Sequence, residues 1–547
     1  MPANKVKSLD YQSLSKSAEK GGANTGDRTS LKSANKSSKE KNGSSPKNLV
    51  NPAKKTSKQF PPESISKTPE AARTENFVSE KNEAQKASFA PAKEIIYAEQ
   101  QKRNKQEKKA EQDRELLGSE RWLIRNGHSL TYLGLYIFSI LVLFRPYELV
   151  PSLSFLSATA FYFAAVTLAV YVPTQLSTEG TLTMFSTEVK CILALTALAL
   201  LTMPIGKDSA VSWEVFNDTF IKAVLIFVVM VNVVRTRRRL TGLIWLSLSV
   251  GLYLSYTALD LYAKGELRTE GYRVAVEIGG LFGNPNDMAL HLVTITPIAV
   301  VLGIASRNPL TRILYFLMAG LFVAANMVTF SRGGFLGLIV SAAVLAWKIG
   351  RKNRLNVTIA STLAGGLFIL AAPGNYGLRL LSIFVPALDM VGSSDQRKEL
   401  FLRSIFVTLR NPWGIGMGNS PVMNDNNLQW HNAFMQVASE LTVLGLLIYL
   451  IFLISPFRKL GAIERTLLAK GEADWFYYLA IGLQASIVGF LVSSFFVSVA
   501  YNWFAYYLIA YAVAFRRVYQ IEKGLKEEVK STSFGDLGKN ILGWRST

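Results

Sequence analysis

The sequence predicts an all-α polytopic membrane protein with about twelve transmembrane helices, one large outer loop and a disordered basic N-terminal tail. Three observations lead to this prediction. The 547-residue chain is 49% hydrophobic with a mean hydropathy of +0.21, and its apolar residues come in runs long enough to cross a bilayer. Basic residues recur in the loops on one predicted side. The first 120 residues, in contrast, are polar throughout.

The N-terminal tail carries 24 Lys and Arg and 16 Asp and Glu in residues 1–120, a net charge of +8. Such a polar segment buries too little apolar surface to offset its chain entropy, so we expect disorder over 1–125. Residues 92–117 could form a charged helix. The tail would contact anionic lipid headgroups or dock a cytoplasmic assembly protein. No nucleic-acid partner is expected, because aromatic residues do not interleave with the charges.

Twelve apolar spans follow the tail. They lie at about 130–147, 151–173, 188–204, 217–234, 239–260, 286–304, 311–330, 333–349, 355–372, 434–455, 476–497 and 500–516. We group helices 1–5 as an N-terminal part and keep the outer loop within a central core. The predicted parts after the tail are 126–262, the core 263–457, the C-terminal helices 458–516 and a cytoplasmic tail 517–547.

The loops that follow even-numbered spans are basic, which fixes a predicted topology. The basic segments are 235–238, 306–312, 348–354, 457–465 and 515–517. With the N-terminal tail inside, all of them are cytoplasmic, as the positive-inside rule requires. Both termini are then cytoplasmic. The segment 261–285, the turn 331–334 and the loop 373–433 face outward.

The outer loop 373–433 is too long to be a simple connection. Its part 376–387 is typical of an interfacial helix that lies on the membrane. Ser394 or Asp395 would cap a second helix over 396–409. That helix carries Arg397, Glu399 and Arg403. The glycine-rich turn 411–419 would return the chain to the bilayer.

Arg332 follows Ser331 and precedes two glycines at the outer junction of spans 7 and 8. A guanidinium there is costly unless it is paired or hydrated, and its donors suit phosphate oxygens. The alternative is an arginine that anchors a tight helical hairpin. Arg268 and Arg273 lie in the preceding outer segment. They are either interfacial anchors or partners of Glu266, Glu270 or Glu277.

Three further residues have sufficient structural explanations. Asn284 is a good N-cap before Pro285, which suits a first helical turn. His291 falls within a span, where we expect it to be buried and hydrogen-bonded. Cys191 is the one cysteine of the chain and cannot form an internal disulfide, so we expect it to pack.

His431 has the strongest functional case among the three histidines. It lies outside with the arginines, and imidazole serves as a general base near neutral pH. The alternative is an interfacial histidine that caps span 10. Glu440 would orient an arginine, cap a polar network or form a structural pair. The chain has no DxD, HExxH or CxxC pattern and no P-loop or Rossmann fingerprint, so we expect neither a metal nor a cofactor.

At these residues the chain resembles the O-antigen ligase and Wzy-type polymerase superfamily. The resemblance covers about 265–450 and rests on the order and spacing of four motifs. They are GNPND (283–287), SRGG (331–334), NPWGIGMGN (411–419) and HN-x-F-x5-E-x4-G from His431 to Gly445. Many members have Glu-x-Gly after the histidine, whereas this chain has Thr442 in place of that glycine.

The resemblance implies a GT-C-like glycosyltransferase in the bacterial inner membrane. It would move a glycan from an undecaprenyl-diphosphate carrier onto a glycan, glycolipid or protein acceptor at the outer face, in the synthesis of lipopolysaccharide or exopolysaccharide. His431 would activate the acceptor hydroxyl. Arg332 and either Arg268 or Arg273 would bind the diphosphate. The implied supporting residues are Glu440, Asn432, Ser331, Asn284 and Arg403.

The motifs do not separate a ligase from a polymerase, because both use the same donor. A different class is a multispan transporter or flippase, which would place its binding groups near the bilayer midplane. A third class is a scaffold of an export complex that docks through the basic tail. Dependence of activity on a proton gradient would favour the transporter. Loss of function on tail deletion, but not in His431→Ala, would favour the scaffold.

Overall fold

The computed structural model describes residues 108, 122–149, 152–154, 159–267, 269, 271–276, 282–352, 354–372, 376–381, 393–424 and 427–524. All of these residues belong to the unit Gln101–Thr547. Every regular element among them is a helix, and the one backbone pairing outside the helices is an antiparallel bridge between Thr269 and Arg273.

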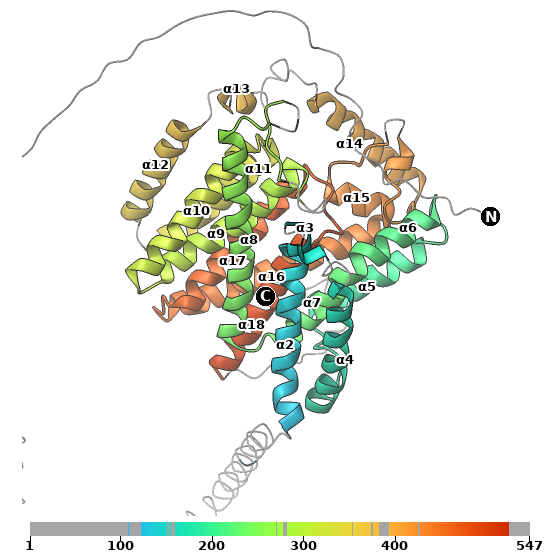
Figure 1. The fold of residues 1–547 in the computed structure, drawn as a ribbon, viewed down its shortest axis with the longest axis horizontal. Helices are drawn as coiled ribbons and strands as arrows, with labels where there is room; N and C mark the ends of the chain where they lie inside the picture. The colour runs from blue at the N-terminus through green and yellow to red at the C-terminus, as the bar shows by residue number, and fades with distance from the viewer. Residues whose placement is uncertain are drawn as a thin grey trace, which may run out of the picture. The chain divides into compact units, whose positions relative to one another are not determined.

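The helices follow one another along the described part of the chain with short connections (Figure 1). The N-terminal helices are α2 (Trp122–Leu143), α3 (Pro146–Leu149), α4 (Thr159–Glu179), α5 (Thr187–Thr202), α6 (Ser209–Val215), the π-helix η2 (Phe216–Phe220), α7 (Ile221–Val233) and α8 (Arg237–Ala263). The central helices are α9 (Pro285–Ala305), α10 (Pro309–Val328), α11 (Arg332–Gly350), α12 (Arg354–Ala371), α13 (Tyr376–Leu381) and α14 (Ser393–Arg410). The last elements are η4 (Pro421–Met423), α15 (Ala433–Glu440), α16 (Thr442–Ala469), α17 (Trp475–Ser494) and α18 (Trp503–Glu522).

Seven described helices are long and apolar enough to cross a membrane, so the chain is an all-helical membrane protein over its described residues. They are Asn126–Leu143 within α2, and α8, α9, α10, α11, α16 and α17. Each coincides with a span predicted from sequence. The other five predicted spans are helical as well, over α4, α5, α7, α12 and α18, but they are not among these seven.

The span predicted over 434–455 is interrupted. α15 ends at Glu440 and α16 begins at Thr442, whose φ of +77° is unusual for a β-branched residue. Carbonyl groups of the last α15 turn accept hydrogen bonds from the backbone N–H groups of Ile415 (2.9 Å) and Gly416 (3.2 Å). The loop before α15 therefore takes hydrogen bonds that a continuous helix would use itself, and the candidate crossing starts at Thr442.

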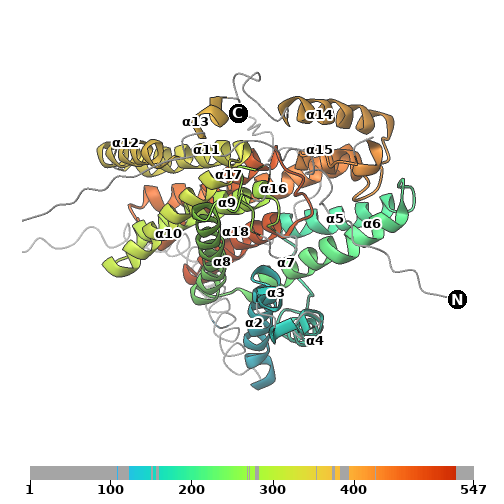
Figure 2. The same cartoon turned by 45° about the horizontal axis from the view of Figure 1, so that its top comes forward.

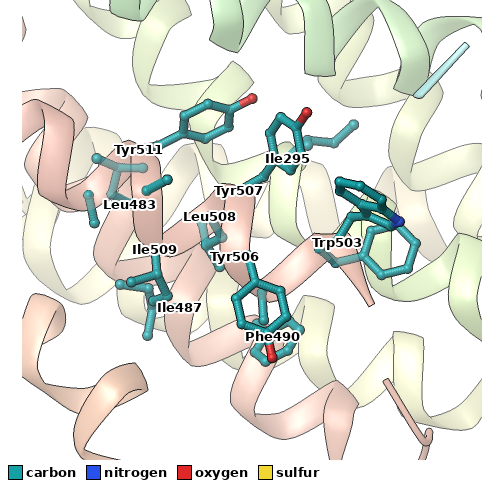
Figure 3. Close-up of a cluster of buried hydrophobic side chains, with 14 of the residues drawn as sticks. Ile295, Leu483, Ile487, Phe490, Trp503, Tyr506, Tyr507, Leu508, Ile509 and Tyr511 are labelled. Carbon is teal, nitrogen blue, oxygen red and sulfur yellow. The ribbon is translucent and has the colours of Figure 1, made fainter. Parts of the chain in front are cut away.

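α9 and α17 form the centre of the described helices. α9 packs against α8, α10, α11 and α17, and residues on all of its sides are buried. Figure 3 shows Ile295 of α9 beside Tyr507 of α18, and Ile487 and Phe490 of α17 beside Ile509 and Tyr506 of α18. A bilayer offers little hydrophobic force between helices, so this close packing is a main source of stability.

Glycine lets α11 and α17 approach each other closely. A Cβ added to Gly337 would lie 2.0 Å from the hydroxyl oxygen of Ser493 and 2.9 Å from the carbonyl oxygen of Gly489. Even alanine at position 337 would therefore push the two helices apart. This contact holds the N-terminal part of α11 beside the C-terminal part of α17.

Three buried or half-buried carboxylates join other helices through ion pairs. Glu464 of α16 pairs with Lys348 and Arg351 around the end of α11. The remaining pairs are Glu188 with Lys459 and Arg516, and Glu179 with Arg235 and Arg517. The sequence patterns did not single out these carboxylates. Each has two cationic neighbours, which offset the cost of burial.

Several predicted boundaries need correction. α2 begins at Trp122, inside the tail predicted to run to residue 125, and α18 continues to Glu522, inside the tail predicted from 517. The helix predicted over 396–409 runs from Ser393 to Arg410. The helix predicted over 376–387 is described only for Tyr376–Leu381. Most of the N-terminal tail, including its predicted disorder and the helix at 92–117, lies outside the described residues.

Candidate functional site

A polar cluster forms where the segment before α9 meets the junction of α10 and α11. Nη2 of Arg273 donates to Oδ1 of Asn286 (2.8 Å), and the Ser331 hydroxyl donates to the same oxygen (2.9 Å). Nε of Arg273 donates to the carbonyl oxygen of Thr329 (2.8 Å). Three segments far apart in the sequence are therefore joined through one side-chain oxygen. We call Arg273, Asn286 and Ser331 the arginine cluster.

The start of α9 positions Asn286. Asn284 is the N-cap, as the sequence predicted, and its side chain accepts a hydrogen bond from the Asn286 N–H (2.8 Å). Pro285 occupies the first helical turn, where its missing N–H costs nothing. Asn284 thus supports the cluster indirectly, by fixing the turn that aims Asn286 at Arg273.

Arg332 is the first residue of α11, directly after the N-cap Ser331. The Ser331 hydroxyl accepts from the Gly334 N–H (3.2 Å) while it donates to Asn286. Phe330, just before the cap, has a left-handed backbone with φ of +49°. Arg332 is 8% exposed and Arg273 is 3% exposed. Two largely buried guanidinium groups are therefore held on neighbouring backbone segments at one helix start.

The sequence left open whether Arg268 or Arg273 is the second arginine of this region. The described structure contains Arg273 in the arginine cluster, whereas Arg268 lies outside the described residues. Arg403 is not part of the cluster. Its Nε donates to the carbonyl oxygen of Met423 (2.9 Å), which ties α14 to the turn after the glycine-rich loop.

His431 lies immediately before α15 in a left-handed conformation with φ of +51°. Asn432 is the N-cap, and its side-chain oxygen accepts from the Phe434 and Met435 N–H groups (2.9 and 3.0 Å). The capping role considered for His431 therefore belongs to Asn432. Non-glycine residues with positive φ are uncommon and often mark functional sites.

Burial and, as a smaller cause, the positive charge of Arg397 on α14 together lower the pKa of His431 from 6.5 to about 4. The imidazole is therefore neutral near pH 7 and keeps the lone pair that a general base needs. Arg397 was visible in the sequence as one of several basic residues of this helix. Nothing in the sequence pattern connected it with His431, because the electrostatic interaction of these two residues depends on how α14 packs.

Glu440 organises the glycine-rich loop. Its carboxylate oxygens accept from the backbone N–H groups of Gly418 (2.9 Å) and Ser420 (3.2 Å). Gly414 and Gly416 have φ of +81° and +85°, so the loop needs glycine where it wraps this end of α15. Of the roles considered from sequence, these two hydrogen bonds of Glu440 match the cap of a polar network.

One segment, residues 493–500, touches both parts of the candidate site. The Ser493 hydroxyl donates to the carbonyl oxygen of Gly333 (3.1 Å), next to Arg332. The Phe495 ring lies against Phe434 of α15, with centroids 6.4 Å apart. The Ala500 N–H donates to the side-chain oxygen of Gln436 (3.2 Å). The start of α11 and the start of α15 are therefore both neighbours of the segment that ends α17 and leads to α18.

The arrangement combines two largely buried arginines with a neutral imidazole. Guanidinium groups stabilise an oxyanion that develops when a phosphate-type leaving group departs. A neutral imidazole accepts a proton from an attacking hydroxyl. No protein-family model and no curated protein matches this chain.

Proposed function

We propose that the chain is a metal-independent membrane glycosyltransferase of the O-antigen ligase and Wzy-type polymerase superfamily. It transfers a glycan from an undecaprenyl-diphosphate carrier to an acceptor hydroxyl. The observation that carries the proposal is the shared contact of residues 493–500 with the starts of α11 and α15. Arg332 and His431 lie at these two starts, so a diphosphate-binding group and a base occupy one neighbourhood.

In the proposed reaction, His431 takes the proton of the acceptor hydroxyl as its oxygen attacks the anomeric carbon of the donor glycan. A new glycosidic C–O bond forms while the C–O bond to the diphosphate breaks. The electron pair of that bond leaves with undecaprenyl diphosphate. Arg332 and Arg273 stabilise the negative charge on the leaving group. The proton on His431 is then released to solvent.

Asn286 and Ser331 are positioning residues in this proposal. They hold Arg273 through a shared oxygen at 2.8 and 2.9 Å, which fixes the charge before substrate binds. Glu440 and Asn432 shape the loop and the helix start that carry His431. A positioned array of charge does not have to reorganise during the reaction, which is the main physical advantage of such a site.

The proposed placement is the bacterial inner membrane, with twelve spans in a GT-C-like arrangement and both termini in the cytoplasm. The site would then face outward, where lipid-linked glycans are presented. The basic segment 306–312 lies at the start of α10, and the basic segment 348–354 lies at the end of α11. Both helix ends are away from Ser331, which supports this orientation through the positive-inside rule.

The transporter alternative lacks a supporting observation among the described residues. Glu464 and Lys348 form the ion pair that joins α16 to α11, but Glu464 lies five residues before the end of a 28-residue helix. Lys348 likewise lies in the last turn of α11. Ion-coupled carriers place such groups near the bilayer midplane, whereas this pair lies at helix ends.

The proposal is tested by the surface glycans of a deletion strain that carries wild type, Arg332→Ala or Arg312→Ala. Arg312 is a matched control, because it is an exposed arginine at the other end of α10. Undecaprenyl-linked intermediates are extracted in parallel. We expect Arg332→Ala to lose transfer at normal protein level and Arg312→Ala to keep it. A normal profile from Arg332→Ala would overturn the role of the arginine.

The same experiment separates the two reaction types. Loss of long chains, with single repeat units still on the acceptor, would identify a polymerase. Loss of all attached chains, with long polymer on the carrier, would identify a ligase.

A further inference from the structure

α14 has two different faces in its C-terminal half. Leu400 and Val407 are buried in a cluster with Ile415 and Trp430, which attaches the helix to α15. The opposite face and the turn after it carry large apolar side chains that are each more than half exposed. These are Leu402 (58%), Phe406 (55%), Leu409 (75%) and Trp413 (76%). Within the helix, the spacing of i, i+4 and i+7 puts them on one stripe.

The exposed stripe is apolar only toward the C-terminal end of α14. Asp395, Lys398 and Glu399 are exposed in the first turns of the same helix. At the other end, the Arg410 guanidinium lies over the Phe406 ring, 4.7 Å from its centroid. The helix therefore changes along its length from a charged exposed surface to an apolar one edged by a cation. A helix that enters a membrane surface at an angle has this pattern.

The segment after the apolar end of α14 is hydrogen-bonded to the segment after α5. The Lys207 N–H donates to the carbonyl oxygen of Ile415 (2.9 Å), two residues after Trp413. Near the same end of α5, Leu201 and Ile205 are each more than half exposed. Figures 1 and 2 both place α14 above α15, near α6, the helix that follows α5. Exposed apolar side chains thus continue from α5 to the stripe.

We propose that residues 402–413 are inserted in the boundary between headgroups and acyl chains, on the side of the membrane that carries the candidate site. The occupant of the stripe is the lipid bilayer. Three large aliphatic or aromatic side chains and a tryptophan suit this boundary, where Trp is enriched. Since Arg397 lies on the same helix, α14 would fix the depth of His431 relative to the lipid surface.

The proposal is tested with spin labels on single cysteines in the full chain, reconstituted in bilayers. The native Cys191 is buried, and its replacement by serine gives a clean background. Labels at Leu402→Cys, Phe406→Cys, Leu409→Cys and Trp413→Cys are compared by their collision rates with oxygen, which concentrates in lipid, and with a water-soluble nickel complex. Lys398→Cys, on the charged part of the same face, is the water reference. Leu447→Cys, exposed on the candidate span α16, is the lipid reference.

We expect the four labels to match the lipid reference, with nickel collision rates severalfold below that of Lys398→Cys. High nickel accessibility at all four positions would overturn the proposal, because the stripe would then face water. Low accessibility to both reagents would overturn it as well, since a protein partner or a second copy would then cover the stripe. No outcome depends on catalytic activity, so this test is independent of the proposed function.

Discussion

The Arg273 guanidinium donates a 2.8 Å hydrogen bond to the side-chain oxygen of Asn286, at the start of α9, a helix that is buried on all sides. The Ser331 hydroxyl uses the same oxygen. A buried donor that loses its acceptor costs more free energy than the bond itself contributes. Asn286 is therefore the residue on which the geometry of the arginine cluster depends.

Asn286→Ala should destabilise the protein by about 1–3 kcal/mol, because it leaves donors of Arg273 and Ser331 without their acceptor. Asn286→Asp keeps an acceptor in place and should cost less. The check is the thermal unfolding midpoint of the purified protein in detergent. Equal midpoints for Asn286→Ala and wild type would show that the shared oxygen does not hold the cluster together.

The pH dependence of transfer should report the surroundings of His431. Its pKa of about 4 keeps the imidazole unprotonated down to mildly acidic pH. Protonation of this base should therefore not reduce the activity as the pH drops from 7.5 toward 5.5. Arg397→Gln removes a positive neighbour, which raises the pKa and moves the acid limb of the rate profile toward neutral pH. The shift is partial, because burial is the larger cause.

Arg410→Gln is the matched control for that profile. Arg410 is on the same helix but is exposed over Phe406, so its loss should leave the acid limb in place. Identical acid limbs for Arg397→Gln and Arg410→Gln would contradict the coupling between α14 and His431.

Gly414→Ala should strongly reduce the amount of folded protein. Its backbone has a φ of +81°, and an added Cβ would lie 2.6 Å from the carbonyl oxygen of Glu440. Gly366→Ala is the control, since its Cβ would meet nothing within 4 Å in helix α12 and alanine favours a helix by about 1 kcal/mol. Size-exclusion profiles of the two purified variants compare them directly. A monodisperse Gly414→Ala at wild-type yield would contradict the loop geometry.

Thr442→Gly should stabilise the protein by about 1 kcal/mol. Glycine adopts a φ of +77° without the backbone strain that a β-branched residue has there. Thr466→Gly lies inside the same helix, α16, and should instead destabilise by about 1 kcal/mol. Unfolding midpoints that fall in both variants would contradict the strain at Thr442.

The sequence was sufficient for features that depend on local pattern. Apolar runs predicted the seven candidate crossings, and Asn284 with Pro285 predicted the start of α9. Long-range packing was not accessible in this way. The helix break before Thr442 arises from hydrogen bonds with the loop at Ile415 and Gly416, and no property of residues 434–455 alone reveals it.

The same limit applies to the candidate site. The motifs predicted that the two helix starts share one side of the membrane, but not that residues 493–500 contact both of them. That segment is a short connection between two apolar helices, without a motif of its own. The coupling of Arg397 to His431 likewise depends on tertiary packing, because residues of α14 and α15 meet only when the outer loop folds back.

The most direct test of the central claim is the transfer rate of the purified protein in lipid bilayers, with an undecaprenyl-diphosphate-linked glycan as donor. Wild type, His431→Ala and His128→Ala are compared, since His128 is a buried histidine of α2 whose Nε2 lies 3.1 Å from the Thr178 hydroxyl, outside the candidate site. We predict that His431→Ala loses roughly 100- to 10,000-fold in rate, while His128→Ala keeps the wild-type rate. A near-normal rate in His431→Ala would contradict the proposal that this histidine is the base.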